Sequence, residues 1–364
     1  MSWNILYILA WLTAAVLATI TTAFCRKLAP RWGFVDKPKQ EAHKAHKSPT
    51  PVLGGLGMAS AWLIVIVGGL AAAKLAPSIV GNDIAPYLDG INAVMPKMAA
   101  IVLGALSFSI LGMCDDKNAL SAKYKFLWQF IIAGAVAASG VRISLFIANP
   151  IFGWCITVLW ITSIVNALNF FDNMDGLAGG TAAIAAFFFF FIAAVRGQHF
   201  VSMLSAVTGG VAIGFLMHNR PPAKIFMGDG GSHFLGFCLA TAGILTTFYL
   251  PNESLTPAPV LIPLLVLSLP LFDAVAVIII RIRLHLPVYV GDNRHISHRF
   301  VHLGLTRPQA VLLVCLLCLI QGAGATTLLW LPAYGFFLIL LQSAALFSLV
   351  CIIQFYAKPA ESTH

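Results

Sequence analysis

The segment from Ile151 to Gly176, IFGWCITVLWITSIVNALNFFDNMDG, combines a long apolar run with a regular series of polar side chains. Residues 151–168 are apolar almost throughout, and a helix that crosses the hydrocarbon core of a bilayer needs about 20 such residues. Polar side chains then recur at every third position, as Asn166, Asn169, Asp172 and Asp175. Residues three apart are neighbours on a helix, so the segment predicts a membrane-spanning helix whose end carries a polar stripe.

The composition of the whole chain indicates a membrane protein. Of the 364 residues, 59% are hydrophobic and 10% are charged, and the mean hydropathy is +0.90. A soluble domain carries about 25% charged residues, and a disordered chain is much less hydrophobic. The composition therefore excludes both a soluble globular protein and a disordered one.

Eleven apolar segments have the length of a membrane span or come close to it. They predict an all-α fold, a polytopic integral membrane helical bundle with about 11 transmembrane helices and a single transmembrane domain over residues 1–364. The expected spans are 3–24, 52–74, 98–113, 126–147, 151–168, 180–195, 201–217, 233–250, 259–280, 309–331 and 334–356.

The basic residues predict the orientation of these spans, because cytoplasmic loops of membrane proteins collect Lys and Arg. Of the 22 Lys and Arg residues, 18 fall on one side of the expected spans. That side is predicted to be cytoplasmic, which puts the N-terminus outside and the C-terminus inside. The same rule explains the net charge of +9, so a nucleic-acid partner is not expected.

Ten of the 13 acidic residues also lie on or near the cytoplasmic side. Carboxylates that converge inside a basic rim favour a divalent cation with a phosphorylated ligand. We therefore expect the active site to be formed by the cytoplasmic loops 25–51, 114–125, 169–179, 218–232 and 281–308.

Two motifs would supply oxygen ligands from helix ends. Asp115 and Asp116 end the third expected span, and adjacent carboxylates repel each other unless a cation or a proton is near. The stripe of amides and carboxylates that begins at Asn166 offers the hard oxygens that suit Mg²⁺. Taken one at a time, a solvated helix end and polar contacts between helices remain alternatives.

A third motif, FMGDGGS at residues 226–232, places Asp229 among glycines before the eighth span. Glycine lets backbone N–H groups approach a ligand closely, and the N-terminus of the next helix, with Ser232 as its cap, would favour an anion. Asp229 would then be placed to bind a metal held by that anion. An ordinary glycine-rich turn is the alternative.

Basic side chains accompany these motifs. Lys125 follows the acidic pair and could bind phosphate as a point charge. The run GDNRHISHR at residues 291–299 combines His and Arg in a way that suits phosphate or carboxylate recognition. For Asp273, inside an apolar span, we expect a structural role that holds neighbouring helices or pairs with Arg281 or Arg283.

With these motifs the chain resembles the polyprenyl-phosphate N-acetylhexosamine-1-phosphate transferases, which form glycosyltransferase family 4. The matching pieces are DKP with KSPTPVLGG, the DD pair, NALNFFDNMDGL, FMGDGGS and RHISHR, in the order of the family and over residues 36 to about 308. Two positions depart from the pattern of the family. Asn173 stands where the family often has Gly in DGxDG, and Ser297 replaces the middle His of HxHHR.

The resemblance implies transfer of a sugar 1-phosphate from a UDP-sugar to a polyprenyl phosphate, with release of UMP. The chain is more similar to the branch that uses UDP-GlcNAc and undecaprenyl phosphate to initiate cell-envelope glycans. It lacks the HHHFE-type segment and the longer loop after the acidic pair of the phospho-MurNAc-pentapeptide transferases, which are the alternative within the family. The enzyme would act on the cytoplasmic face of the cell's inner (plasma) membrane, and whether it forms a homodimer stays open.

The resemblance also implies roles for single residues. Mg²⁺, or Mn²⁺ in its place, would be held by Asp229, Asp172 and Asn169. Asp115 and Asp116 would act with Asp229 in catalysis by positioning the lipid phosphate. The substrate contacts would come from Lys47, Lys125, Asn169, Asp175, His295, His298 and Arg299.

Three other classes of protein compete with this interpretation. A secondary transporter places polar residues near the midplane and often has two similar halves, whereas here they gather at one interface and no repeat is found. A CDP-alcohol phosphotransferase would carry DGxxAR followed by GxxxDxxxD, of which only Asp175-Gly176 is present. A catalytically silent scaffold would not need to retain the acidic residues.

Overall fold

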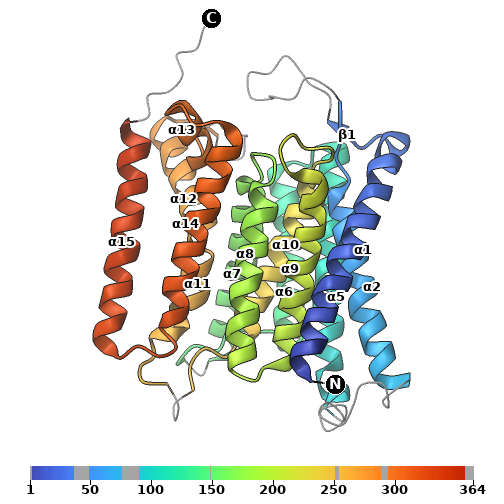
Figure 1. The fold of residues 1–364 in the computed structure, drawn as a ribbon, viewed down its shortest axis with the longest axis vertical. Coiled ribbons are helices and arrows are strands. Elements are labelled where there is room, and N and C mark those ends of the chain that lie inside the picture. Colours follow the sequence, from blue (N-terminus) through green and yellow to red (C-terminus); the bar gives the residue numbers. More distant parts are fainter. Residues whose placement is uncertain are drawn as a thin grey trace, which may run out of the picture.

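The computed structural model describes residues 2–36, 49–75, 90–147, 149–250, 254–287 and 294–356. In these ranges long α-helices run side by side, and a short antiparallel hairpin of β1 (Val35–Asp36) and β2 (Thr50–Pro51) lies at one end (Figure 1). The first helices are α1 (Trp3–Trp32), α2 (Gly54–Leu75), α5 (Ile91–Asn118), α6 (Ala122–Ala138), α7 (Pro150–Phe171), α8 (Leu177–Val195) and α9 (His199–Asn219). They are followed by α10 (Gly228–Leu245), the 3₁₀ turn η1 (Ala258–Leu261), α11 (Ile262–Val266), α12 (Ser268–Arg283), α13 (Ile296–His302), α14 (Arg307–Thr327) and α15 (Ala333–Tyr356).

Eight helices in the described part of the chain are long and apolar enough to cross a membrane. The number is nine if the two helical parts Ala258–Val266 and Ser268–Arg283, which are bent relative to each other, form one span. Eight of the expected spans are confirmed in this sense, and the protein is an all-α, polytopic membrane protein. The expected spans 126–147 and 233–250 correspond to α6 and α10, which are also helices. However, α6 has only 17 residues, and α10 carries Asp229, Ser232 and His233 in its first two turns.

The expected span 259–280 is wrong as a continuous helix. The chain forms α11 and α12 there, and the axes of the two parts differ by 66°. Pro270 explains the break, because proline has no N–H to donate to the carbonyl of Val266 and its ring would clash with that carbonyl. The bend lets α12 leave the direction of the other helices on its way to α13.

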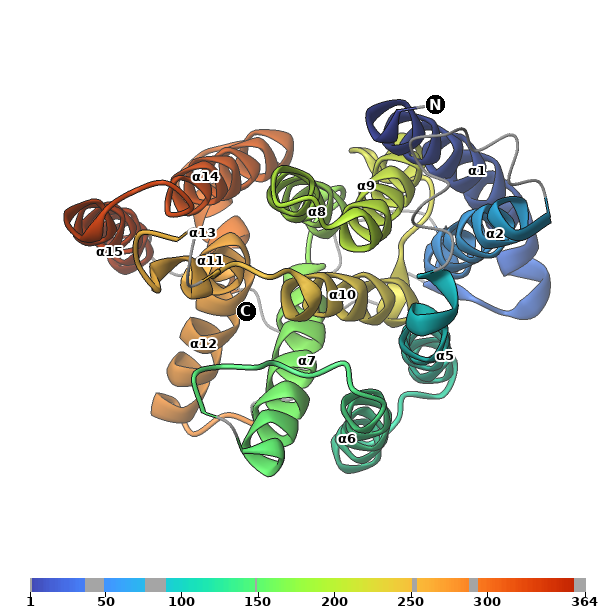
Figure 2. The ribbon, with the colours of Figure 1, turned by 90° about the horizontal axis from the view of Figure 1, so that it is seen from below.

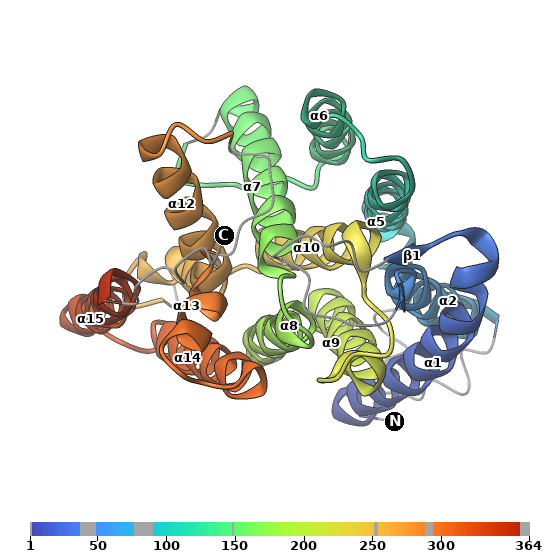
Figure 3. The same cartoon turned by 90° about the horizontal axis from the view of Figure 1, so that it is seen from above.

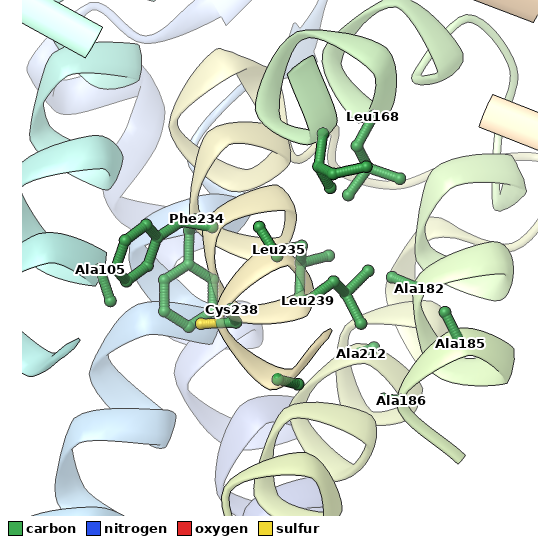
Figure 4. Close-up of a cluster of buried hydrophobic side chains, with 14 of the residues drawn as sticks. Ala105, Leu168, Ala182, Ala185, Ala186, Ala212, Phe234, Leu235, Cys238 and Leu239 are labelled. Atoms are coloured by element: carbon green, nitrogen blue, oxygen red, sulfur yellow. The ribbon is translucent and has the colours of Figure 1, made fainter. Parts of the chain in front are cut away.

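Helix α10 forms the centre of the bundle. Seen along the helices, it is surrounded by α5, α7, α8 and α9 (Figures 2 and 3). Phe234, Leu235 and Leu239 of α10 are fully buried among side chains of these neighbours, such as Ala105 of α5 and Leu168 of α7 (Figure 4). Protein rather than lipid covers α10, which explains how it tolerates polar residues at its start.

Glycines let three helices approach α10 closely. A Cβ atom on Gly112 of α5 would overlap the carbonyl group of Asp229, and one on Gly55 of α2 would overlap the backbone of Gly231. On α10 itself, a Cβ on Gly236 would lie 2.8 Å from Cα of Val165 in α7. These contacts involve backbone atoms, which cannot rotate away, so the position of α10 depends on them.

We predict that Gly112→Ala lowers the melting temperature of the purified protein, because the added methyl group pushes α5 away from α10. Overpacking of this kind costs about 1–3 kcal/mol. Gly68→Ala in α2 is the matched control, since no atom lies within 4 Å of its added Cβ. Thermal unfolding in detergent checks the prediction, and equal melting temperatures of the two variants would contradict it.

Candidate active site

A cavity of about 720 Å³ opens at the end of the bundle where the C-terminal ends of α5 and α7 meet the start of α10. The hairpin β1–β2 and helix α13 lie at the same end, which Figure 3 views from above. The expected site residues among those lining the cavity are Asp116, Asn169, Asp172, Asp175, Asp229 and His298. Residues that are up to 182 positions apart along the chain therefore share one cavity.

The glycine-rich motif is the first turn of α10 and not a separate turn before it. Gly228 begins the helix with φ of 66°, a left-handed conformation that suits glycine. The carboxylate of Asp116 then accepts hydrogen bonds from the N–H groups of Asp229, at 2.8 Å, and Gly230, at 3.1 Å. An acidic side chain of the protein itself thus caps this helix, where the sequence favoured a bound anion.

This arrangement gives Asp116 a structural task that its sequence does not reveal. Both of its oxygens already have backbone donors before any substrate binds, and the bonds fix the side chain of Asp229 at the cavity wall. The expected action of Asp116 on a lipid phosphate stays a prediction.

Lys125 lies between two carboxylates. Its Nζ is 2.7 Å from Oδ2 of Asp115 and 2.5 Å from Oδ2 of Asp229; the side chains of Lys125 and Asp115 are largely buried, and that of Asp229 is partly buried. Asp115 also accepts a hydrogen bond from the backbone N–H of Leu120 at 2.7 Å. Neither Lys125 nor Asp115 lines the cavity, and Lys125 is connected to it through its ion pair with Asp229.

Asn169 joins α7 to α10. Its Nδ2 donates to Oδ1 of Asp229 at 2.8 Å and to Oγ of Ser232 at 2.9 Å. Asn166, one turn earlier, instead donates to Gln129 of α6 at 2.6 Å and to the carbonyl of Thr162. The polar stripe is therefore divided, since Asn166 connects helices and Asn169 belongs to the site.

Helix α7 also ends before the last two residues of the polar stripe, which was expected to be helical throughout. Helix α7 ends at Phe171, so Asp172 and Asp175 lie in the loop before α8 and not on one helical face. Asp175 accepts a hydrogen bond from the N–H of Ala223 at 2.9 Å. Burial, followed by the negative charges of Asp229, Asp116 and Asp175, raises the pKa of Asp172 to about 8. The surroundings of Asp172 therefore disfavour its ionised form.

Helix α13 brings one of the two expected histidines, His298, to the cavity. Asp273, which is fully buried in α12, accepts hydrogen bonds from Nδ1 of His295 at 2.6 Å and from the N–H of Ile296 at 2.7 Å. The expected structural role of Asp273 takes this form, with a partner that was not anticipated. His298 lines the cavity, and burial, together with the charges of His295, Arg307 and His302, lowers its pKa to about 4. His298 is therefore neutral at pH 7.

The remaining expected residues lie behind the cavity wall or outside the described ranges. His295 and Arg299 belong to α13 and its cap but do not line the cavity. Lys47 lies outside the described residues. The structure adds Asn173 and Arg307 to the lining; the sequence marks Asn173 only as a departure from the pattern of the family and gives no signal for Arg307.

The donor atoms at the cavity fit a Mg²⁺ ion that shares its ligands with a phosphate. Among the described residues, no three side chains of His, Cys, Asp or Glu are grouped so that they could hold a metal by themselves. Mg²⁺ usually takes one or two protein carboxylates and fills its other positions with water and substrate phosphates. Asp229 and Asp172 offer two carboxylates at the cavity, and Asn169 lies beside them with its amide oxygen 3.4 Å from Nζ of Lys125.

Comparison with known proteins agrees with these motifs. Residues 98–247 match the family described as glycosyl transferase family 4. A probable undecaprenyl-phosphate N-acetylglucosaminyl 1-phosphate transferase of Bacillus subtilis is 31% identical over 97% of this chain and 94% of its own length. A decaprenyl-phosphate N-acetylglucosaminephosphotransferase of Mycobacterium tuberculosis is 29% identical over 88% of this chain and 81% of its own length.

A second group of relatives covers less of the chain. A phospho-N-acetylmuramoyl-pentapeptide-transferase of Geobacillus kaustophilus is 32% identical over 65% of this chain and 73% of its own length. The identity over nearly full length to the Bacillus protein, together with the matched family region, decides the assignment. The chain belongs to glycosyl transferase family 4.

Proposed function

We propose that this protein transfers N-acetylglucosamine 1-phosphate from UDP-N-acetylglucosamine to undecaprenyl phosphate, releases UMP and thereby starts the synthesis of a lipid-linked glycan of the cell envelope. The observation that carries this proposal is the cavity at the end of the helices, where five aspartates and three asparagines from distant segments gather. The relatives that match most of the chain are named for the same kind of transfer.

The proposal includes the orientation of the protein in the plasma membrane. With α6, α10 and the bent pair counted as spans, the chain crosses the bilayer eleven times. The start of α1 and the end of α15 lie at opposite ends of the bundle (Figure 1), in agreement with an odd number of crossings. The cavity lies at the same end of the bundle as the described parts of the expected cytoplasmic loops, and the sequence assigns 18 of the 22 basic residues to those loops, so we infer that it faces the cytoplasm, where UDP-sugars are made.

In the reaction, a phosphate oxygen of the lipid attacks the β-phosphorus of the UDP-sugar. The new P–O bond forms as the bond from the β-phosphorus to the bridging oxygen breaks, and UMP leaves with that oxygen and its electron pair. A phosphate monoester has a second pKa of about 6 and is mostly ionised at pH 7. The protein therefore needs to align two anions and offset their charge, and it needs no strong base.

The residues divide this work between them. Mg²⁺, when bound by Asp229, Asp172 and Asn169, would neutralise charge on the diphosphate. Asp116 holds Asp229 through the start of α10, and Asp115 holds Lys125 beside it. His298, neutral at pH 7, offers hydrogen bonds to the diphosphate or the sugar, while Arg307 supplies positive charge at the same wall.

We predict that the purified protein releases UMP when it is given UDP-N-acetylglucosamine, undecaprenyl phosphate and MgCl₂. UDP-N-acetylgalactosamine and UDP-N-acetylmuramoyl-pentapeptide, tested as alternative donors, should give much slower release. Asp229→Asn keeps the shape of the side chain but removes its charge, so we expect turnover to fall at least about 10²-fold.

Lys123→Met is the control for the activity assay, because Lys123 is exposed on α6 and lies outside the cavity lining. It should retain the activity of the wild type, and Asp229→Asn should keep a cooperative thermal transition. Solute uptake into vesicles without UMP release would favour a transporter. Full turnover of Asp229→Asn would contradict the role of Asp229.

We further predict that Lys125→Met lowers the melting temperature in EDTA, because the carboxylates of Asp115 and Asp229 lose the cation between them. Loss of one partner from such a partly buried cluster costs about 2 kcal/mol. MgCl₂ should stabilise Lys125→Met more than the wild type, since an ion can replace the missing ammonium group.

Lys123→Met serves as the matched control here too, since it removes the same charge from an exposed position two residues away. Its melting temperature should equal that of the wild type with and without MgCl₂. If Lys125→Met and Lys123→Met melt at the same temperature and respond alike to MgCl₂, the proposed cation site beside Asp229 is wrong.

A further inference from the structure

One hydrogen bond joins two walls of the cavity that are far apart in the sequence. Oγ of Ser297 in α13 donates to Oδ1 of Asn173 in the loop between α7 and α8, at 2.5 Å. Ser297 is fully buried, so water does not compete for its hydroxyl group, and Asn173 lines the cavity. No role in the transfer reaction has been given to either side chain above.

Both partners of this bond are held by further contacts. Nδ2 of Asn173 donates to the carbonyl of Phe170 at 3.0 Å, which fixes the amide with Oδ1 turned toward Ser297. On the other side, Asp273 binds His295 and the N–H of Ile296, the two residues before Ser297. Three successive residues at the start of α13 are therefore bonded to acceptors on two different segments.

The bond lies between two groups that face the cavity. Asn173 directly follows Asp172, and Ser297 directly precedes His298, and both Asp172 and His298 line the cavity. The hydrogen bonds of Asp273 connect α13 to α12. The bond to Asn173 connects α13 to the loop between α7 and α8, which carries Asp172 and Asp175. The bond therefore spans the two segments that carry Asp172 and His298.

We propose that Asn173 and Ser297 form a positioning pair that sets His298 at the correct distance from the acidic wall and thereby determines the affinity for the diphosphate of the sugar nucleotide. The inference rests on the proposed function, since it needs a UDP-sugar in the cavity. Neither side chain touches a reacting atom, because both act through their neighbours. Donor binding should suffer more than the chemical step, and binding of the lipid phosphate should be unaffected.

A double-mutant cycle tests the pair with Asn173→Ala, Ser297→Ala and the double variant. UMP release is measured against the concentration of UDP-N-acetylglucosamine at saturating lipid, and against lipid at saturating donor. Each single variant should raise the KM for the donor about 5–10-fold, the effect of one lost buried hydrogen bond. The double variant should resemble the single variants, because the same bond cannot be lost twice.

Two further variants separate positioning from simple loss of stability. Ser297→Cys nearly keeps the volume of the side chain, but a thiol is a poor hydrogen-bond donor, so this variant should raise the KM for UDP-N-acetylglucosamine as Ser297→Ala does. Ser297→Thr keeps the hydroxyl group and should have the KM of the wild type. Ser268→Ala is the matched control, because it removes a buried hydroxyl in α12 that donates to the carbonyl of Leu265 at 2.6 Å, outside the cavity lining. It should lower the melting temperature and leave the donor KM unchanged.

The outcomes are distinguishable. An active wild type whose single variants keep the donor KM, or whose double variant shows the product of the single effects, contradicts the positioning pair and leaves the proposed function intact. A lower melting temperature of the variants at constant KM means a structural role and also contradicts the pair. A folded wild type that releases no UMP contradicts the proposed function, and the positioning pair with it.

Discussion

The hydrogen bonds from the start of α10 to the carboxylate of Asp116 are the contact on which the site depends. They are made where α5 approaches α10 so closely that Gly112 has no room for a side chain. This contact orients Asp229, and Asp229 in turn binds Lys125 and Asn169. The acidic cluster is thus anchored on α10, the central helix of the bundle. Protein rather than lipid surrounds the sides of α10, so this helix can carry polar groups at its end.

The cluster places a cation where carboxylates would otherwise repel each other. Lys125 offsets Asp115 and Asp229, whereas no basic side chain among the described residues forms such an ion pair with Asp172, whose pKa is raised by burial and by its acidic neighbours. Asp229, whose charge Lys125 offsets, and Asp172, whose burial favours its protonated form, line the same cavity, and a divalent ion that arrives with a phosphate would favour the ionised form of Asp172. At the other wall, the neutral His298 can bind a phosphorylated donor without adding fixed charge.

Much of this could be predicted from the sequence, because apolar runs and polar ends follow from the cost of placing polar groups in lipid. Eight spans, and the gathering of Asp116, Asp172 and Asp229 at one end of the bundle, could be predicted on this basis. The cap formed by Asp116 depends on a contact between segments distant in the sequence, so periodicity could not reveal it. The break before Pro270 and the end of α7 before Asp172 are local features that hydrophobic periodicity alone does not mark. Asn173 and Ser297 show the same limit, since the sequence marks each as a separate departure from the pattern of the family, and only the structure shows that they bind each other.

The location of a divalent ion tests the central claim most directly. Crystals of the wild-type protein grown with UDP-N-acetylglucosamine and Mn²⁺, measured at the manganese absorption edge, would show the ion as an anomalous peak. We predict one peak inside the cavity, within bonding distance of the carboxylate of Asp229 and of the diphosphate. A peak elsewhere in the protein, or a bound diphosphate whose ion has no contact with Asp229 or Asp172, would contradict the account.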